Sequence, residues 1–269
     1  MTLTPDPGGR RMTVPRPTRR AGLALLAGGA RALATPALGQ SSFAGYVEAF
    51  RARARARGIS DATYDRAMGG LVADEEVLQL QRRQAEFTET PGQYMVRRVT
   101  DWRITTGRQR AQENAQLLAR IEAEHGVDRF AVMSVWGNES SFGEVLTNTR
   151  VMRNVFRSLA TLGWGEPRRK SYWEGELLNA LTIVERGWAD PREMVGSWAG
   201  AMGHTQFMPE AWLRIAVDFD GDGRRNLFRI PDALASTARF LRERGRWQTG
   251  QPWGFEVAPP AGFDSNLAD

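Results

Sequence analysis

The sequence contains no cysteine. This absence excludes a disulfide framework, a thiolate nucleophile, a cysteine-ligated zinc and a lipidated cysteine as a stable membrane anchor. Histidine is also scarce, and only His125 and His204 are present. The two are far apart in the chain and neither lies in an H-E-x-x-H pattern. We therefore expect neither a catalytic zinc nor a histidine-based triad.

Long apolar runs are absent too, and the excess of positive charge is confined to one end. No stretch of about 20 apolar residues occurs, so no transmembrane helix is predicted. The formal charge is +5, and residues 1–39 supply all of it, because six arginines there accompany a single acid. The near-neutral remainder argues against a nucleic-acid partner, since phosphate binding requires an excess of positive charge.

Residues 1–39 have the pattern of an export signal. A basic region that ends in two arginines precedes an apolar, glycine-rich run over 21–30, and small residues at 37–39 predict cleavage before Gln40. The paired arginines favour a twin-arginine exporter, with the Sec route as the alternative. A disordered Arg/Pro-rich tail is the other interpretation. With export and no anchor, we expect a soluble periplasmic protein.

From Gln40 onward the sequence predicts a succession of helices. Capping residues, glycines and prolines bound the segments, which are 43–57, 62–68, 74–87, 94–103, 108–125, 130–136, 166–186, 210–217 and 232–244. The alternating arginines of 51–57 are interpreted as a solvated helical face rather than a binding stripe. The fold class is therefore mainly α.

Glu139 is the candidate catalytic residue. It follows an apolar helical run, 130–136, and Gly137-Asn138, and precedes two serines, Phe142 and Gly143. A carboxylate at the rim of an apolar wall loses hydration, which raises its pKa and suits a general acid. The alternative is a structural glutamate at a helix end.

Two further stretches have the composition of a ligand site. Residues 196–209 are rich in glycine, aromatic and amide side chains, which suit close approach to sugar rings; a buried glycine-rich connection is the alternative. Arg168 and Arg169 lie where a helix is predicted to begin. Positive charges at the start of a helix interact unfavourably with the helix dipole unless they bind an anion or sugar oxygens. The alternative is that both arginines are simply solvated.

Residues 218–224 match the first half of an EF-hand calcium loop. Aspartates stand at positions 1, 3 and 5, glycine at 6, and the carbonyl of Arg224 at 7. Arg229 stands at position 12, where a bidentate glutamate is usual, and Asp232 is the candidate that closes an enlarged loop and caps the next helix. Calcium is predicted, sodium would fit the same oxygens, and a simple Asp/Gly turn is the alternative.

Together these motifs resemble the lytic murein transglycosylases of the membrane-bound B type. The resemblance rests on G-N-E-S-S-F-G, the P-R-R helix start, G-S-W-A-G-A-M-G-H-T-Q-F-M-P, V-D-F-D-G-D-G and W-G-F-E-V, and covers about 43–264. It implies a lysozyme-like helical fold with an N-terminal helical part, 40–127, and a catalytic core, 128–269. It also implies cleavage of peptidoglycan between MurNAc and GlcNAc, leaving 1,6-anhydro-MurNAc ends. No organic cofactor is expected.

The resemblance also assigns roles to residues. Glu139 falls on the position of the family's single catalytic acid/base. Glycosidases usually need two carboxylates. One carboxylate is enough for the reaction here if the substrate's N-acetyl group stabilises the oxocarbenium-like centre. Substrate contacts are expected from Ser197, Gln206, Arg168, Arg169 and Tyr94, and cation ligands from Asp218, Asp220, Asp222, the Arg224 carbonyl and Asp232.

Relatives of this type usually continue beyond the W-G-x-E-V segment, so the C-terminal part of the cleft is expected to be missing. This leaves an alternative to the enzyme: a catalytically weak peptidoglycan-binding or scaffold protein of the same fold. A calcium-binding regulator is a more distant alternative. Preferred stem peptide, endo or exo action, oligomeric state and protein partners do not follow from the sequence.

Overall fold

The computed structural model describes residues 42–83 and 90–252, together with 254, 256, 258 and 260–262. The predicted export signal and most of the W-G-F-E-V segment lie outside these residues. The described residues, from 42 onward, all fall in one compact unit, and the division into the parts 40–127 and 128–269 stays a prediction. No helix of the described residues is long and apolar enough to cross a membrane.

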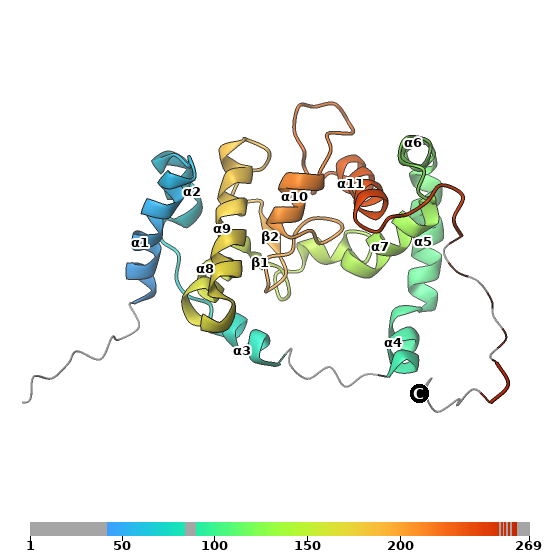
Figure 1. Cartoon of the computed structure of the whole chain (residues 1–269), viewed down its shortest axis with the longest axis horizontal. Helices are drawn as coiled ribbons and strands as arrows, with labels where there is room; N and C mark the ends of the chain where they lie inside the picture. Colours follow the sequence, from blue (N-terminus) through green and yellow to red (C-terminus); the bar gives the residue numbers. More distant parts are fainter. Residues whose placement is uncertain are drawn as a thin grey trace, which may run out of the picture. The chain divides into compact units, whose positions relative to one another are not determined.

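The regular structure of the described chain is almost entirely helical, as predicted (Figure 1). Its α-helices are α1 Phe43–Ala56, α2 Asp61–Met68, α3 Glu75–Arg83, α4 Pro91–Arg98, α5 Asp101–Glu113, α6 Ala115–His125, α7 Arg129–Ser140, α8 Val155–Gly165, α9 Lys170–Glu185, α10 Pro209–Ile215 and α11 Ile230–Glu243. Two short 3₁₀ segments are η1 Glu144–Thr147 and η2 Pro167–Arg169. Strands β1 Arg153–Asn154 and β2 Val195–Gly196 pair antiparallel.

The larger hydrophobic cluster is built from α1, α2, α3, α8, α9 and α10. Helix α8 lies at its centre and packs along α9 (Figure 1), and it was not among the predicted helices. Its side chains Val155, Phe156, Leu159 and Leu162 are fully buried. Burial of each such side chain stabilises the fold by about 1.5–3 kcal/mol, so α8 contributes strongly to the stability of this cluster.

The smaller hydrophobic cluster joins α6, α7 and α11. Its largest member is Trp136 of α7, which is fully buried. Phe142, directly after α7, belongs to the same cluster, whereas Phe207, in the glycine-rich stretch, belongs to the larger one. The turn after α7 and the glycine-rich stretch thus pack into different clusters.

Two predicted helix boundaries are wrong. The predicted break before Arg108 does not exist, because α5 runs through Gly107, and the chain breaks instead at Thr100, which caps α5, and at Asn114. Likewise α7 continues through Gly137-Asn138 to Ser140. The second error comes from treating Gly137 as a helix breaker where it is a packing position, and Gly107 in α5 is a packing position as well.

Candidate active site

Helix α7 places Glu139 in its last turn. The helix begins after Asp128, whose carboxylate caps it by accepting hydrogen bonds from the backbone N–H groups of Phe130 (2.7 Å) and Ala131 (3.3 Å). It ends at Ser141, which has a left-handed φ of 52°. Its buried face carries Val132, Met133 and Trp136, so the helix is fixed on that side and Glu139 stands at the exposed edge of this face.

The chain leaves α7 through a strained turn. Both Ser141 and Phe142 have positive φ, 52° and 57°, a conformation that costs a non-glycine residue about 1–3 kcal/mol and persists where packing imposes it. Packing does so here, because the Phe142 ring contacts Trp136 edge-on, with centroids 5.6 Å apart, and lies over two glycines. A Cβ on Gly137 or Gly107 would be 2.6 Å or 3.0 Å from its Cζ.

We expect Gly137→Ala to lower the free energy of unfolding by about 1–3 kcal/mol, the usual cost of an extra methyl group in a packed core. The Phe142 ring cannot retreat without disturbing Trp136. Gly175→Ala is the matched control, because a Cβ there, in α9, contacts nothing within 4 Å and alanine favours helix by up to about 1 kcal/mol. Urea unfolding of both variants tests this, and equal stabilities would contradict it.

His204 holds the end of α7 against the glycine-rich stretch, a role that sequence reasoning missed. Its Nδ1 accepts a hydrogen bond from Trp136 Nε1 (3.0 Å), and its carbonyl accepts one from Ser140 Oγ (2.6 Å). Burial lowers the pKa of His204, opposed by a hydrogen bond with the Phe228 backbone. The imidazole is therefore neutral near pH 7 and acts as a structural acceptor.

Glu139 borders a pocket of about 410 Å³ between α7, α11 and the glycine-rich stretch. The lining is mostly apolar, and its members are Val135, Glu139, Thr205, Gln206, Phe207, Met208, Ala211, Thr237, Phe240 and Leu241. Burial against this wall raises the pKa of the Glu139 carboxyl, and the charge of Arg98 opposes the rise. Among the described lining residues Glu139 is the only carboxylate, so an acid with a raised pKa stands here without a second one beside it.

The glycine-rich stretch brings Gln206 into this pocket but leaves Ser197 outside its lining. Gln206 has a positive φ of 52°, and its amide Nε2 donates to the Gly203 carbonyl (3.0 Å), so its amide oxygen remains available to a ligand. Ser197 Oγ accepts from the Ala201 N–H (3.2 Å) and still carries its own donor. The stretch is non-helical, as predicted.

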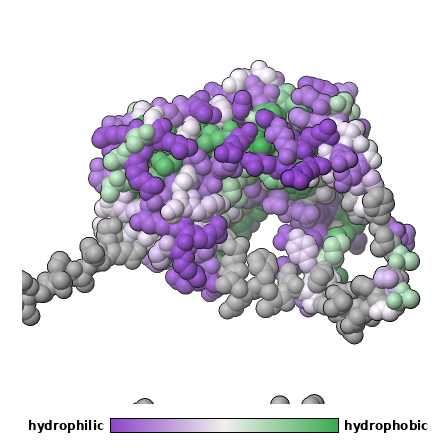
Figure 2. Space-filling model, viewed as in Figure 1, coloured by the Kyte–Doolittle hydropathy of each residue, from purple (hydrophilic) through white to green (hydrophobic). Residues whose placement is uncertain are grey.

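A second pocket, about 310 Å³, lies on the other side of α7, against α5 and the end of α4. Its walls are apolar, with three arginines, Arg98, Arg103 and Arg108. Arg98 is the residue whose charge acts on Glu139. It also lies over the ring of Tyr94, 5.1 Å from the centroid. Tyr94 itself lines neither this pocket nor the Glu139 pocket, and its assignment to substrate stays a prediction. Most of the face seen in Figure 2 is hydrophilic, with apolar side chains showing between polar ones.

Arg168 and Arg169 are exposed and do not line either pocket. Their unfavourable place at a helix start is compensated by Glu166, whose carboxylate accepts from the backbone N–H groups of Arg168 (3.3 Å) and Arg169 (3.0 Å). Arg169 also lies over the ring of Tyr172, 4.4 Å from its centroid. Local contacts therefore account for both arginines, and their assignment to substrate stays a prediction.

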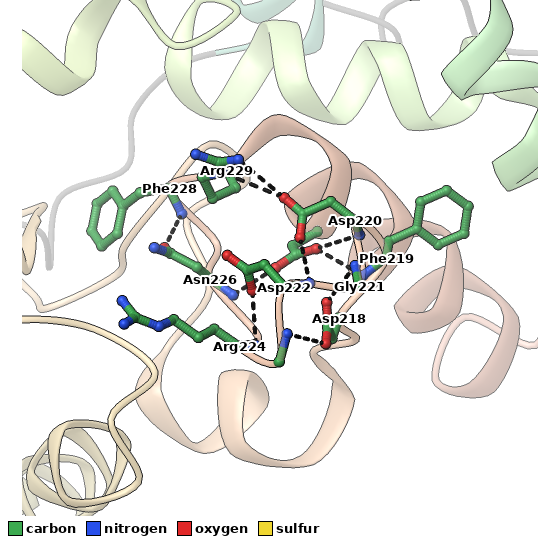
Figure 3. A network of polar contacts seen from close by, with 11 residues as sticks. Asp218, Phe219, Asp220, Gly221, Asp222, Arg224, Asn226, Phe228 and Arg229 are labelled. Atoms are coloured by element: carbon green, nitrogen blue, oxygen red, sulfur yellow. Dashed lines mark hydrogen bonds and ion pairs between the residues drawn. The ribbon is translucent and has the colours of Figure 1, made fainter.

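The loop before α11 gathers three exposed carboxylates, those of Asp218, Asp220 and Asp222 (Figure 3). One oxygen from each lies within 4.8 Å of the others. Calcium holds oxygen ligands at about 2.3–2.6 Å, so two ligands on opposite sides of one ion are about 5 Å apart. The cluster therefore has the donor chemistry and the spacing that a hard cation requires. The loop turns at Gly221 and Gly223, both with positive φ.

Asp232 is not a helix cap, contrary to prediction. Helix α11 already begins at Ile230, and the fully buried Asp232 carboxylate turns back to the loop. Its oxygens accept from the N–H groups of Phe219 (2.8 Å), Asp220 (3.3 Å) and Asn226 (2.7 Å). Burial raises the pKa of Asp232, and these three hydrogen bonds oppose the rise. Its clear role is to hold the loop's backbone.

Comparison with solved structures supports the fold and the family. SltB3 from Pseudomonas aeruginosa, in complex with NAG-NAM-pentapeptide, is 45% identical with a TM-score of 0.78, over 85% of this chain and 60% of that chain. Slt35 from Escherichia coli, in complex with calcium, is 27% identical with a TM-score of 0.67, over 77% and 65%. The mainly α-helical, lysozyme-like fold expected from the resemblance is thereby confirmed.

Sequence comparison gives the same family. The membrane-bound lytic murein transglycosylase B of Escherichia coli (strain K12) is 38% identical over 133 residues, which are 49% of this chain and 36% of that protein. The chain thus spans only part of the length of these relatives. Residues 42–269 match the family model described as the transglycosylase SLT domain. The chain belongs to the transglycosylase SLT domain family, as its motifs predicted.

Proposed function

We propose that the protein is a lytic transglycosylase of peptidoglycan. It cleaves the β-1,4 bond between MurNAc and GlcNAc and closes a 1,6-anhydro-MurNAc end without adding water. The observation that carries the proposal is Glu139, one carboxyl with a raised pKa at the edge of an apolar pocket. A second structure of SltB3, in complex with NAG-anhNAM-pentapeptide, covers 85% of this chain at 45% identity, and supports the same product class.

In the first step Glu139 acts as the general acid. Its carboxyl gives a proton to the glycosidic oxygen as the bond from that oxygen to C1 of MurNAc breaks, and the departing sugar becomes an alcohol. The substrate's own N-acetyl oxygen stabilises the positive C1, the task that a second carboxylate performs in other glycosidases. The lining of the Glu139 pocket supports these roles of Glu139 and the N-acetyl group, because its other described members are not carboxylates.

In the second step Glu139 acts as the general base. The carboxylate takes the proton of the MurNAc 6-hydroxyl as that oxygen bonds to C1, so the enzyme regains its starting protonation. The apolar wall formed by Phe207, Met208 and Phe240 limits competing water. Gln206 and Ser197 are the side chains proposed to hold the N-acetyl group and the glycan.

The glycan is proposed to lie along α7. The pockets on its two sides are joined by a third, of about 440 Å³, which shares Phe130 and Ser134 with one and Val135 and Leu241 with the other. Phe130 is exposed to 64%, and aromatic faces suit sugar rings. Tyr94, Arg168 and Arg169 remain proposed contacts to the strand or its peptide stem.

Digestion of peptidoglycan sacculi followed by mass analysis of the products tests this function. Release of muropeptides with 1,6-anhydro ends is expected. Hydrated ends would indicate a hydrolase instead. Binding to sacculi without release would favour the alternative, a catalytically weak peptidoglycan-binding or scaffold protein, which stays open because the chain covers 60% of the SltB3 chain.

We expect Arg98→Gln to move the alkaline limb of the pH profile of kcat/KM to higher pH. Glu139 must be protonated to act as the acid, so the rate falls as the pH rises through its pKa. Arg98 lowers that pKa, and without its charge the acid form persists to higher pH. Arg108→Gln is the matched control, because Arg108 lines the same pocket as Arg98 and does not act on Glu139. Coincident profiles of all three proteins would contradict the assignment.

We propose that the Asp218–Asp222 loop holds a structural calcium ion. The spacing of its carboxylates supports this, as does the structure of Slt35 in complex with calcium. The side chains of Asp218, Asp220 and Asp222 would supply three ligands, the Arg224 carbonyl a fourth, and Asp232 would hold the loop or close the site; sodium would fit the same oxygens. We also propose that residues 1–39 direct export to the periplasm.

A further inference from the structure

Arg229 occupies the place in the loop where an EF-hand has its last carboxylate. Its guanidinium instead lies on a loop carboxylate, with Nη2 3.3 Å and Nε 3.4 Å from Oδ2 of Asp220. Figure 3 shows Arg229 pointing at Asp220, whereas the side chain of Arg224 points away from the three aspartates. A positive charge thus stands where a metal-binding loop usually adds a negative one.

The ion pair is placed to break and re-form. The Arg229 side chain is exposed to 59%, and both of its contacts with Asp220 are long for charge-assisted hydrogen bonds. Its backbone is fixed, because Arg229 is the N-cap residue of α11. Among the ion pairs of the described residues, this is the one that reaches the Asp218–Asp222 cluster.

We propose that Arg229 is a built-in counter-cation of the loop that competes with the bound metal ion. With no ion bound, its charge relieves the repulsion among the three aspartates and keeps the loop folded. When an ion binds, Asp220 turns from Arg229 to the metal, and the two positive charges repel. Arg229 thereby weakens the affinity of the site. This inference rests on the proposed cation site and says what sets its affinity.

The size of the effect follows from the charges. A guanidinium about 6 Å from a divalent ion, in watery and partly screened surroundings, weakens binding about three- to tenfold. The Coulomb energy is proportional to the charge of the ion, so for sodium the factor is about the square root of this, roughly two- to threefold. Calcium and sodium are thus distinguished by how strongly each responds to loss of Arg229.

The test compares the wild-type protein with Arg229→Gln, Arg229→Lys and Arg224→Gln by calorimetric titration with Ca²⁺ and, separately, with Na⁺, at constant ionic strength. Arg229→Gln removes the charge at Asp220, and Arg229→Lys keeps it. Arg224→Gln removes the same charge from the same loop, but from a side chain that points away (Figure 3). Circular dichroism of each variant in chelator, with thermal unfolding with and without Ca²⁺, verifies the fold and gives a second readout.

Arg229→Gln is expected to bind Ca²⁺ about three- to tenfold more tightly and to gain more in Tm from Ca²⁺ than the wild type. The other two variants are expected to stay within about twofold of wild-type affinity. Equal affinity of Arg229→Gln and the wild type, or an equal gain in Arg224→Gln, overturns the role of Arg229 and leaves the calcium site standing. No binding of Ca²⁺ or Na⁺ by any variant overturns both.

Discussion

Glu139→Gln is expected to abolish release of 1,6-anhydro muropeptides and leave the fold unchanged. The amide is close in shape to the carboxyl but can neither give the proton to the glycosidic oxygen nor take the one from the 6-hydroxyl. General acid–base catalysis contributes about 10²–10⁴-fold to a rate. Because one residue serves both steps, we expect turnover to fall at least about a thousandfold. Product analysis by mass spectrometry measures this directly.

The stability of Glu139→Gln separates a catalytic loss from misfolding. The folded-state pKa of Glu139 is raised by burial, so ionising it disfavours the native state once the pH exceeds the pKa of the unfolded chain. The neutral amide removes that cost. The free energy of unfolding at pH 7 is therefore expected to be unchanged or slightly higher, within about 0.5 kcal/mol, because Glu139 is only partly shielded from solvent, which reduces the cost of its charge.

Glu144→Gln is the matched control for the catalytic assignment. Glu144 is an exposed carboxylate in η1, five residues further on, and does not line the Glu139 pocket. Its substitution removes the same charge at nearly the same place and is expected to leave turnover within about twofold, because solvent screens such charges. Survival of activity in Glu139→Gln, or equal loss in Glu144→Gln, would show that Glu139 is not the acid.

Local signals in the sequence predict local structure well. Gly126 ends α6 in the left-handed conformation, with φ 66°, and Asp128 caps α7 two residues later. Both depend on a few neighbouring residues, which the sequence displays directly. The non-helical stretch from Gly196 to Phe207 and the Asp/Gly loop were predictable for the same reason.

Features that depend on distant residues could not be predicted in this way. A helix break was predicted between residues 103 and 108, and another at Gly137, but Gly107 and Gly137 both lie inside helices and make room for one ring, that of Phe142. Nothing in the sequence around Gly107 indicates that ring, and near Gly137 only the fold shows that Phe142 turns back onto the helix. The role of His204 depends likewise on Trp136, far away in the chain.

In the candidate site, too, the residues were predictable from local motifs, whereas their surroundings were not. Glu139 and Gln206 were chosen from motifs, and the structure brings both to one pocket. The wall that raises the pKa of Glu139 is partly made by Phe240 and Leu241 of α11, about 100 residues later in the chain. Motifs in the sequence therefore identify the chemical groups of the site. The surroundings that change the pKa of Glu139 depend on how the helices pack.

Asp232→Ala is expected to lower the free energy of unfolding by about 3–5 kcal/mol, the cost of removing one member of a buried charged network. The carboxylate is fully buried and accepts three loop N–H groups, those of Phe219, Asp220 and Asn226. Alanine leaves all three without that acceptor, and each buried donor without a partner costs about 1–3 kcal/mol. Urea unfolding in chelator measures the loss without any contribution from a bound ion.

Ser236→Ala is the reference variant against which the loss of unfolding free energy in Asp232→Ala is compared. Ser236 is also fully buried in α11, and its Oγ accepts a single loop N–H, that of Val217 (3.0 Å). About 1–2 kcal/mol is expected for it. If Asp232→Ala loses no more than Ser236→Ala in chelator but much more in Ca²⁺, the carboxylate acts chiefly as a metal ligand. A large loss under both conditions means that Asp232 builds the loop before any ion arrives, since its three hydrogen bonds need no metal.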